Sequence, residues 1–376
     1  MPASESIQQA AWRRLKKNKG AVFGMVVIGL AVVVAIGAYF IASDHSPFTN
    51  RMAVEIGGAK PGYRQQFLLV KKNQPVAHRN IIERLLNGQE DSYTYIPIST
   101  YKSEGDSLIV EKYIDEGIGE RQAFAYKDMA DSNWRQTTAG TPEGYVHHHQ
   151  IISKTFLLGT DQYGRDILSR LLLGTRISLS VGMIAVIISL TIGILLGALA
   201  GYFGGWADDV IMWLINVIWS IPTLLLVFAI TLLLGKGFWQ VFIAVGLTMW
   251  VSVARIVRGQ VLGVRELEYV EAARALGYSH TRIIFRHILP NILGPVLVVA
   301  ASNFASAIVI EAGLSFLGVG VQPPQPSWGL MIKENYNFII THNPMLALAP
   351  GFAIMLLVLA FNLLGNGLRD ALNVRA

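Results

Sequence analysis

The chain has 376 residues, of which 52% are hydrophobic and 15% are charged, with a formal net charge of +6 at pH 7 and a mean hydropathy of +0.44. Soluble globular chains carry about a quarter charged residues, so this composition excludes an ordinary soluble domain and indicates an integral membrane protein. The positive charge does not indicate nucleic-acid binding, because no basic aromatic surface accompanies it. The absence of cysteine excludes disulfides, thiol catalysis and cysteine-ligated metals.

The chain begins with a basic segment followed by an apolar run. Residues 1–19 hold five Lys or Arg side chains and one acid, and residues 20–43 hold no charged side chain. About 20 apolar residues cross a bilayer, whereas the apolar region of a cleaved signal peptide has only about 7–15. We therefore expect a cytoplasmic tail over 1–19 and a retained first transmembrane helix over 20–43.

Residues 44–157 have a different composition, with 13 Lys or Arg against 14 Asp or Glu. Gln66–Val70 and Ser107–Val110 predict strands, and Asn80–Leu86 predicts a short helix. The segment is long enough for a small α+β domain, which we expect outside the cytoplasm because it follows a span whose N-terminus is inside. His147, His148 and His149 do not predict a metal site, because three adjacent side chains cannot all face one ion in regular structure.

Residues 158–176 join this segment to the next apolar run. Leu168, Leu171 and Leu172 share one helical face, and Arg165 and Arg176 lie on others. This pattern predicts an amphipathic helix at the membrane interface that leads into a span.

Residues 177–376 contain five further uncharged runs that predict transmembrane helices. These lie at 177–207, 210–235, 237–254, 287–310 and within 335–368. Glycines spaced by four in the first run predict a ridge for helix packing: Gly193, Gly197, Gly201 and Gly205. Pro222 should kink the second run and is a candidate residue for translocation or gating. Glu311, near the outer end of the fifth span, is a candidate for translocation or gating, and a structural role is the alternative.

A polar stretch over 255–290 interrupts these runs with six arginines and three acids. Val270, Ala273 and Gly277 recur at helical spacing, which places small side chains on one face. Gly277 can end that helix, Ser279 can cap a second one and Pro290 interrupts or kinks it. The stretch therefore predicts a helix–turn–helix with a small-residue face that another protein can approach closely.

The distribution of charge predicts the topology. With six spans and an inside N-terminus, the cytoplasmic tails and short loops hold thirteen Lys or Arg, and the outer short loops hold two. Positive residues collect on the cytoplasmic side of membrane proteins. Both termini and the loop 255–290 are therefore expected in the cytoplasm, with residues 44–176 outside it.

Three segments carry a resemblance to a known family. Glu271-Ala272-Ala273, Gly277 and Leu289-Pro290 resemble the "EAA" loop of bacterial ABC importer permeases. Residues 158–179 and 311–329 are similar to the second ("C") membrane subunit of the peptide/nickel transport permeases. His287 and Asn366 depart from that family, which often has Ile and usually has Asp at these places. The resemblance does not extend to 44–157, where the family usually has a much shorter connection.

The resemblance implies an all-α polytopic fold, the six-helix type I ABC importer permease, with the α+β domain inserted. It implies a permease subunit that forms the translocation path for dipeptides or oligopeptides in the bacterial inner membrane. The implied partners are a homologous second permease, two cytoplasmic ABC ATPases and an external substrate-binding protein. The residues implied to couple the permease to the ATPases are Glu271, Ala272, Ala273, Gly277, Leu289 and Pro290.

No sequence of the form GxxxxGK[ST] occurs, so we do not expect the chain to be an enzyme or to hold a cofactor. ATP and Mg²⁺ would belong to the partner ATPases. Permeases of the same family for nickel chelates or peptide antibiotics remain alternatives. A secondary transporter without ATPases is a further one, although such proteins place ionisable groups at the bilayer midplane, and the uncharged runs offer only Glu311 near an end.

Overall fold

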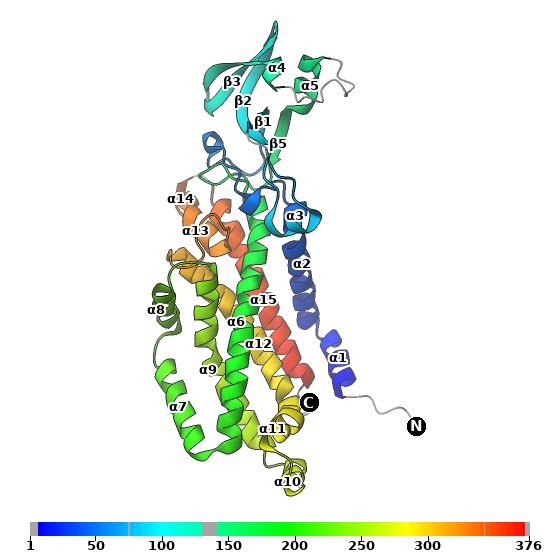
Figure 1. The fold of residues 1–376 in the computed structure, drawn as a ribbon, viewed down its shortest axis with the longest axis vertical. Helices are drawn as coiled ribbons and strands as arrows, with labels where there is room; N and C mark the ends of the chain where they lie inside the picture. Colours follow the sequence, from blue (N-terminus) through cyan, green and yellow to red (C-terminus); the bar gives the residue numbers. More distant parts are fainter. Residues whose placement is uncertain (1–6, 74–75, 130–140, 342, 373–376) are drawn as a thin grey trace, which may run out of the picture.

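The computed structural model describes residues 7–73, 76–129, 141–341 and 343–372. A bundle of long helices forms one end of an elongated molecule, and a β-sheet forms the other (Figure 1). The first described helix of the chain and the end of the last one lie at the end of the bundle opposite to the sheet, as does helix α10 (Glu268–Ala275). The described ends of the chain and α10 therefore lie together at one end of the bundle, and the sheet lies at the other.

Within the described residues, five helical segments are long and apolar enough to cross a membrane, and a bent helix pair would make a sixth span. The long helices are α2 (Lys19–Ile41), α6 (Ile167–Phe203), α9 (Phe238–Val264), α12 (Leu289–Phe316) and α15 (Met345–Leu372). The bent pair is α7 (Gly205–Trp219) and α8 (Thr223–Leu234). The prediction of a polytopic helical membrane protein is thus confirmed, with one of the predicted spans divided in two.

Most of the basic N-terminal segment is helical. Helix α1 (Ile7–Lys17) ends at Asn18, whose side chain accepts a hydrogen bond from Ala21 N at 3.1 Å and so caps α2. Leu15 is buried in a small cluster with Ala21 and Ala371. The first and last helices of the chain are therefore packed together at the end of the bundle that holds α10.

The described part of residues 44–157 forms a five-stranded antiparallel sheet with the strand order β4-β3-β2-β1-β5. The strands are β1 (Tyr63–Lys71), β2 (Tyr93–Glu104), β3 (Ser107–Asp115), β4 (Ile118–Ala125) and β5 (Ile151–Phe156). Leu68, Leu108 and Val146 lie in its core with the short helices α4 (Tyr126–Met129) and α5 (Pro142–His149). Two 3₁₀ turns, Pro47–Thr49 and Val54–Ile56, and helix α3 (Ile81–Asn87) complete the segment.

The three adjacent histidines are the last three residues of α5. His147 Nε2 is 3.0 Å from Ser103 Oγ on β2 and 3.8 Å from Glu143 Oε1 on its own helix. Among the described residues, no group of three His, Cys, Asp or Glu side chains is arranged to hold a metal ion. His147 instead joins helix α5 to the sheet.

Residues 158–176 differ from the predicted amphipathic helix. Residues 158–166 are not helical, and α6 begins at Ile167 and runs without a break to Phe203. Arg165 and Arg170 are almost fully buried and share Glu334 of helix α13 (Trp328–Asn335), at 2.7 Å and 3.4 Å from Glu334 Oε2. Because a buried charge needs a partner, the arginines face Asp161 and Glu334 within the protein instead of a free polar surface.

Helices α6 and α9 pack closely through three of the four predicted glycines. A Cβ atom at Gly197 would lie 2.5 Å from Ala254 O, and one at Gly201 would lie 2.8 Å from Arg258 O. Gly193 likewise faces Val253 and Trp250 O. Gly205 is not part of this ridge, because it begins α7 with a φ of +51° and a Cβ there would meet nothing within 4 Å. We call the contact through Gly193, Gly197 and Gly201 the glycine seam.

Candidate functional site

The bend between α7 and α8 opens one side of the bundle. The two helices meet at 92°, with Ser220 ending α7 and Pro222 preceding the first residue of α8. Proline has no backbone N–H, so it cannot continue the hydrogen bonding of α7. The predicted kink at Pro222 is confirmed, and it is large enough to separate two helices.

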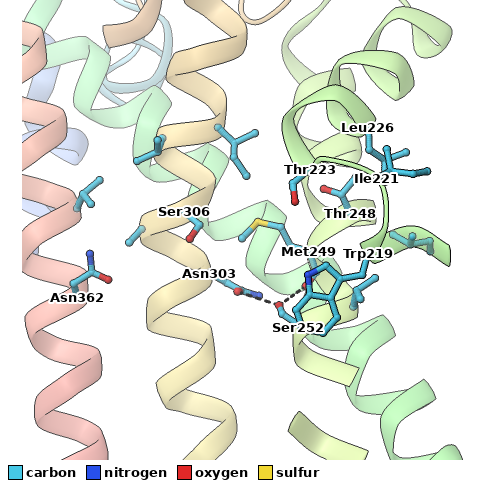
Figure 2. Close-up of a pocket in the computed structure, with 16 residues that line it drawn as sticks. Trp219, Ile221, Thr223, Leu226, Thr248, Met249, Ser252, Asn303, Ser306 and Asn362 are labelled. Carbon is cyan, nitrogen blue, oxygen red and sulfur yellow. Dashed lines mark hydrogen bonds between the residues drawn. The ribbon is translucent and has the colours of Figure 1, made fainter. Parts of the chain in front are cut away.

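A pocket of about 510 Å³ lies beside this bend, between α8, α9, α12 and α15 (Figure 2). Ile221 and Thr223, which flank Pro222, belong to its lining. None of the described residues that line it is charged. The lining combines apolar side chains with six hydroxyl or amide side chains: Thr223, Thr248, Ser252, Asn303, Ser306 and Asn362.

The polar groups of the pocket leave hydrogen-bonding capacity free. Ser252 Oγ donates to Met249 O at 2.9 Å and lies 3.4 Å from Asn303 Oδ1, and the two side chains point toward each other in Figure 2. Asn303 Nδ2 is buried and has no hydrogen-bond partner within the described chain. An unsatisfied buried donor is costly, so a ligand with a carbonyl oxygen would be stabilised here.

Glu311 does not line the pocket. It is fully buried in α12, and its Oε1 accepts a hydrogen bond from Ser315 Oγ at 2.7 Å. Ser315 Oγ also accepts from Val321 N at 3.0 Å. These contacts connect Glu311 to the turn that follows α12, and Pro222 is the predicted gating residue that lies beside the pocket.

Helix α10, at the end of the bundle, turns its predicted small-residue face inward. Val270 and Ala273 are buried in a cluster of this chain that includes Ile283 and Ile288. The outward face consists of other residues of the same stretch, which include Glu268, Tyr269, Glu271, Ala272 and Leu276. The prediction that Ala273 faces another protein is wrong, because its own chain covers it.

Tyr269 adds an uncharged polar group to this outward face. Partial burial raises the pKa of its phenol above the ordinary value of 10.0. A phenol is protonated at neutral pH even at the ordinary pKa, so Tyr269 can donate a hydrogen bond to a partner.

A Schellman motif ends α10. Tyr278 N donates to Ala273 O at 3.1 Å and Gly277 N donates to Arg274 O at 2.9 Å. Gly277 has a φ of +75°, which favours glycine, and a Cβ there would meet nothing within 4 Å. Gly277 is therefore required for the turn itself. Ser279 Oγ then accepts from Arg282 N and caps α11 (His280–Ile283), as the sequence predicts.

The chain continues as a helix from α11 into α12. A π-helical turn over Ile284–Ile288 joins the two, with Leu289 N donating to Ile284 O. Pro290 lies in the first turn of α12, so it does not interrupt the helix. The irregular turn precedes Pro290 because the missing N–H and the ring of proline do not fit regular α-helical bonding.

Helix α10 and the residues on both sides of it contact three long helices at this end of the bundle. Arg265 donates to Gly201 O of α6 at 3.0 Å, and Tyr202 Oη lies 2.8 Å from His280 Nδ1. The buried cluster around Val270 also contains Val257 of α9 and Ile292 of α12. The buried cluster therefore connects α10 to α6, α9 and α12.

Two features of the structure were missed by sequence reasoning. One is the cluster of Asp161, Arg165, Arg170 and Glu334, whose signal was the presence of charges beside an apolar run. The other is the set of polar pocket residues, whose only signal was the occurrence of Asn303 and Asn362 within uncharged runs.

Comparisons with known proteins give two matching families. Residues 193–376 match the binding-protein-dependent transport system inner membrane component family, and residues 6–75 match the N-terminal TM domain of oligopeptide transport permease C. Residues 76–192, which include most of the sheet, lie in neither match.

Individual proteins are similar over a larger part of the chain. A glutathione transport system permease of Pectobacterium atrosepticum is 45% identical over 221 residues, which are 59% of this chain and 73% of that protein. A dipeptide transport system permease of Alkalihalophilus pseudofirmus is 45% identical over 57% of this chain and 70% of its own length. An inward-facing structure of the MetNI methionine ABC transporter has a TM-score of 0.46 and 18% identity, over 55% of this chain and 97% of its own.

Proposed function

This chain belongs to the family of inner membrane components of binding-protein-dependent transport systems, and we propose that it forms the path by which an ATP-driven importer carries dipeptides or oligopeptides. The peptide class is supported by the names of the relatives and by the match to oligopeptide transport permease C. The fold proposed with it is that of a type I ABC importer permease.

One structural observation carries this proposal. Helices α9 and α12 line the pocket, and nearer the other end of the bundle they share a buried cluster with α10. A force applied to α10 is therefore transmitted to two walls of the pocket. Such a connection suits a permease that alternates between two arrangements of packed helices.

The chemistry of the pocket supports a peptide cargo. A peptide offers an N–H and a carbonyl oxygen at most residues, and the hydroxyl and amide side chains around Asn303 can pair with both. The pocket has no charged lining that would select one side-chain charge. It therefore suits a cargo recognised by its backbone.

The coupling site is proposed on the outward face of α10. Ala272 and Leu276 would contact a cytoplasmic ATPase, and Glu271 would orient the helix. Gly277 would set the turn, and Leu289 and Pro290 would join the site to α12. ATP binding by two such ATPases would move α10 and the helices attached to it, with ATP and Mg²⁺ held by the ATPases.

The remaining partners and the orientation follow from this assignment. A second permease would complete the path, and an external binding protein would deliver the cargo. The protein would lie in the bacterial inner membrane, with both termini and α10 in the cytoplasm. The described sheet of residues 44–157 would be an extracytoplasmic domain.

The test compares two adjacent alanines of α10. Ala272→Arg adds a charge to the exposed face and is expected to abolish co-purification of the ATPases and peptide uptake, with the thermal stability of the permease unchanged. Ala273→Arg places an unpaired charge in a buried cluster and is expected to cost roughly 3–5 kcal/mol of unfolding free energy. If Ala272→Arg leaves both ATPase binding and uptake intact, the coupling site is assigned wrongly.

A further inference from the structure

Helix α3 presents an apolar face that the rest of the chain leaves uncovered. Ile81, Ile82 and Leu86 are 76%, 71% and 58% exposed. At 3.6 residues per turn, these side chains and Leu85 occupy an arc of roughly 140°, and Glu83, Arg84 and Asn87 occupy the rest of the helix. The helix is therefore amphipathic, with its apolar side free.

This helix is fixed beside the end of the first membrane-spanning helix (Figure 1). The guanidinium group of Arg176 donates to the carbonyl oxygens of Leu85 at 2.8 Å and Leu86 at 2.9 Å. The same group donates to Ala35 O at 2.9 Å and Ile36 O at 3.1 Å on α2. One side chain thus holds the last turn of α3 against α2.

The position of these hydrogen bonds along α2 defines the depth of α3 in the lipid bilayer. Ile36 lies five residues before the end of α2 at Ile41, which corresponds to roughly 8 Å along the helix axis. The 23 residues of α2 extend over roughly 34 Å, close to the roughly 30 Å thickness of the hydrocarbon core. With α2 centred on the bilayer, the last turn of α3 therefore lies roughly 6 Å inside the boundary between hydrocarbon and headgroups, within the roughly 5–10 Å to which interfacial amphipathic helices insert.

Helix α2, which packs against α3, also exposes apolar side chains. Ile36, Phe40 and Ile41 are all about half exposed at the same level of the bundle. These side chains belong to the surface that a membrane-spanning helix presents to lipid. An aqueous surface would leave both sets of side chains in water, whereas a bilayer covers both.

Helix α3 is formed before it meets any partner. Asn80 and Glu83 make a reciprocal capping box at its beginning, and Arg79 donates to Asn87 O and Gly88 O at its end. A Cβ at Gly88 would lie 2.8 Å from the Tyr39 ring of α2, so the chain turns there in close contact with the span. Little conformational entropy is lost when such a helix binds a surface.

We propose that α3 is a membrane-interface anchor that inserts Ile81, Ile82 and Leu86 into the outer surface of the lipid bilayer. The anchor would hold the sheet in a fixed position above the bundle. It binds lipid through apolar side chains, so it requires no particular headgroup.

The chain has no native cysteine, so single cysteines report on the site directly. Ile82→Cys, Arg84→Cys and Lys127→Cys would each be labelled with an environment-sensitive fluorophore in the full-length protein. Each protein would be assembled with its partner subunits in nanodiscs of phosphatidylethanolamine and phosphatidylglycerol. Some lipids would carry a spin-label quencher just below the headgroup. Arg84 lies on the polar side of the same helix, and Lys127 lies in α4, at the end of the sheet far from the bundle.

The label at position 82 is expected to lose most of its emission in the presence of the quencher lipid and to shift to shorter wavelength. The label at 84 should be quenched less, and the label at 127 should be unaffected. Equal quenching at 82 and 127 would overturn the proposal. Shielding at 82 that appears only after the substrate-binding protein is added would also overturn it, because the face would then bind protein instead of lipid.

Discussion

The two sides of α9 differ in how closely neighbouring helices pack against them. Toward α6, the glycine seam brings backbone against backbone, with no space for a single added carbon at Gly197. Toward α8, the same helix borders a pocket of about 510 Å³, and α8 buries only Val227 and Thr231 in this chain. The side of α9 toward α6 is therefore closed by backbone contact, whereas the side toward α7 and α8 combines buried contacts with an open pocket.

This difference indicates which parts of the permease can move. Closely packed helices resist small displacements because each one forces many contacts to change together. We expect α6, α9 and α10 to move as one body, since the seam and the buried cluster around Val270 join them. The boundary with α7 and α8 is where the shape of the path can change.

Among changes to the two sides of α9, the largest effect is expected from filling the glycine seam. Gly197→Leu forces a side chain against Ala254 O and Val257, and overpacking of this kind costs about 1–3 kcal/mol of unfolding free energy. Peptide uptake should be lost as well, because α6 and α9 can no longer keep their spacing. Thermal unfolding in detergent and uptake in reconstituted vesicles measure the two effects.

Gly259→Leu is the matched control for this variant. Gly259 lies in α9, and a Cβ there would meet nothing within 4 Å. Its stability should change by less than about 1 kcal/mol. If the two leucine variants have the same stability, the seam is not the rigid contact that the structure indicates.

A smaller change in stability, with a loss of uptake, is expected from filling the pocket. Ser306 is exposed on its wall, so Ser306→Trp has space for the ring but occludes the path. Uptake should fall severely while the unfolding temperature stays close to that of the unchanged protein. Leu297→Trp, on an exposed part of the same helix, is the control and should transport normally. Normal uptake by Ser306→Trp would show that cargo does not pass this pocket.

The smallest effect on stability is expected at the ion pair that connects α9 to α7. Arg258 of α9 donates through Nε and a terminal nitrogen to both carboxylate oxygens of Asp208 on α7, at 2.5 Å and 2.6 Å. Both side chains are partly exposed, so Asp208→Asn should cost about 1 kcal/mol or less. Thermal unfolding at low and high salt checks this, because screening should shrink the difference between the two proteins. A much larger loss would mean that α7 belongs to the rigid body.

Local features of the sequence were sufficient to predict several parts of this protein's structure. Apolar runs predict the spans because a bilayer requires about 20 such residues wherever they lie in the chain. Gly277 predicts the end of α10 and Pro222 predicts the bend, because both act through their own backbone. The motif residues of the polar stretch 255–290 were sufficient to indicate the family, which the comparisons confirm.

The tertiary structure alone decided which side of each element faces the protein. Periodicity placed Val270 and Ala273 on one face of a helix, but only packing against Ile283 and Ile288 shows that this face is internal. Gly205 fits the spacing of the seam yet lies beyond the helix that forms it, and Arg165 and Arg170 are buried because Glu334 approaches from a distant segment. Strand β5 likewise pairs with β1 across more than half of the inserted segment. The physical reason is the same in each case: a spacing fixes which residues share a face, whereas the partner that covers that face comes from elsewhere in the chain.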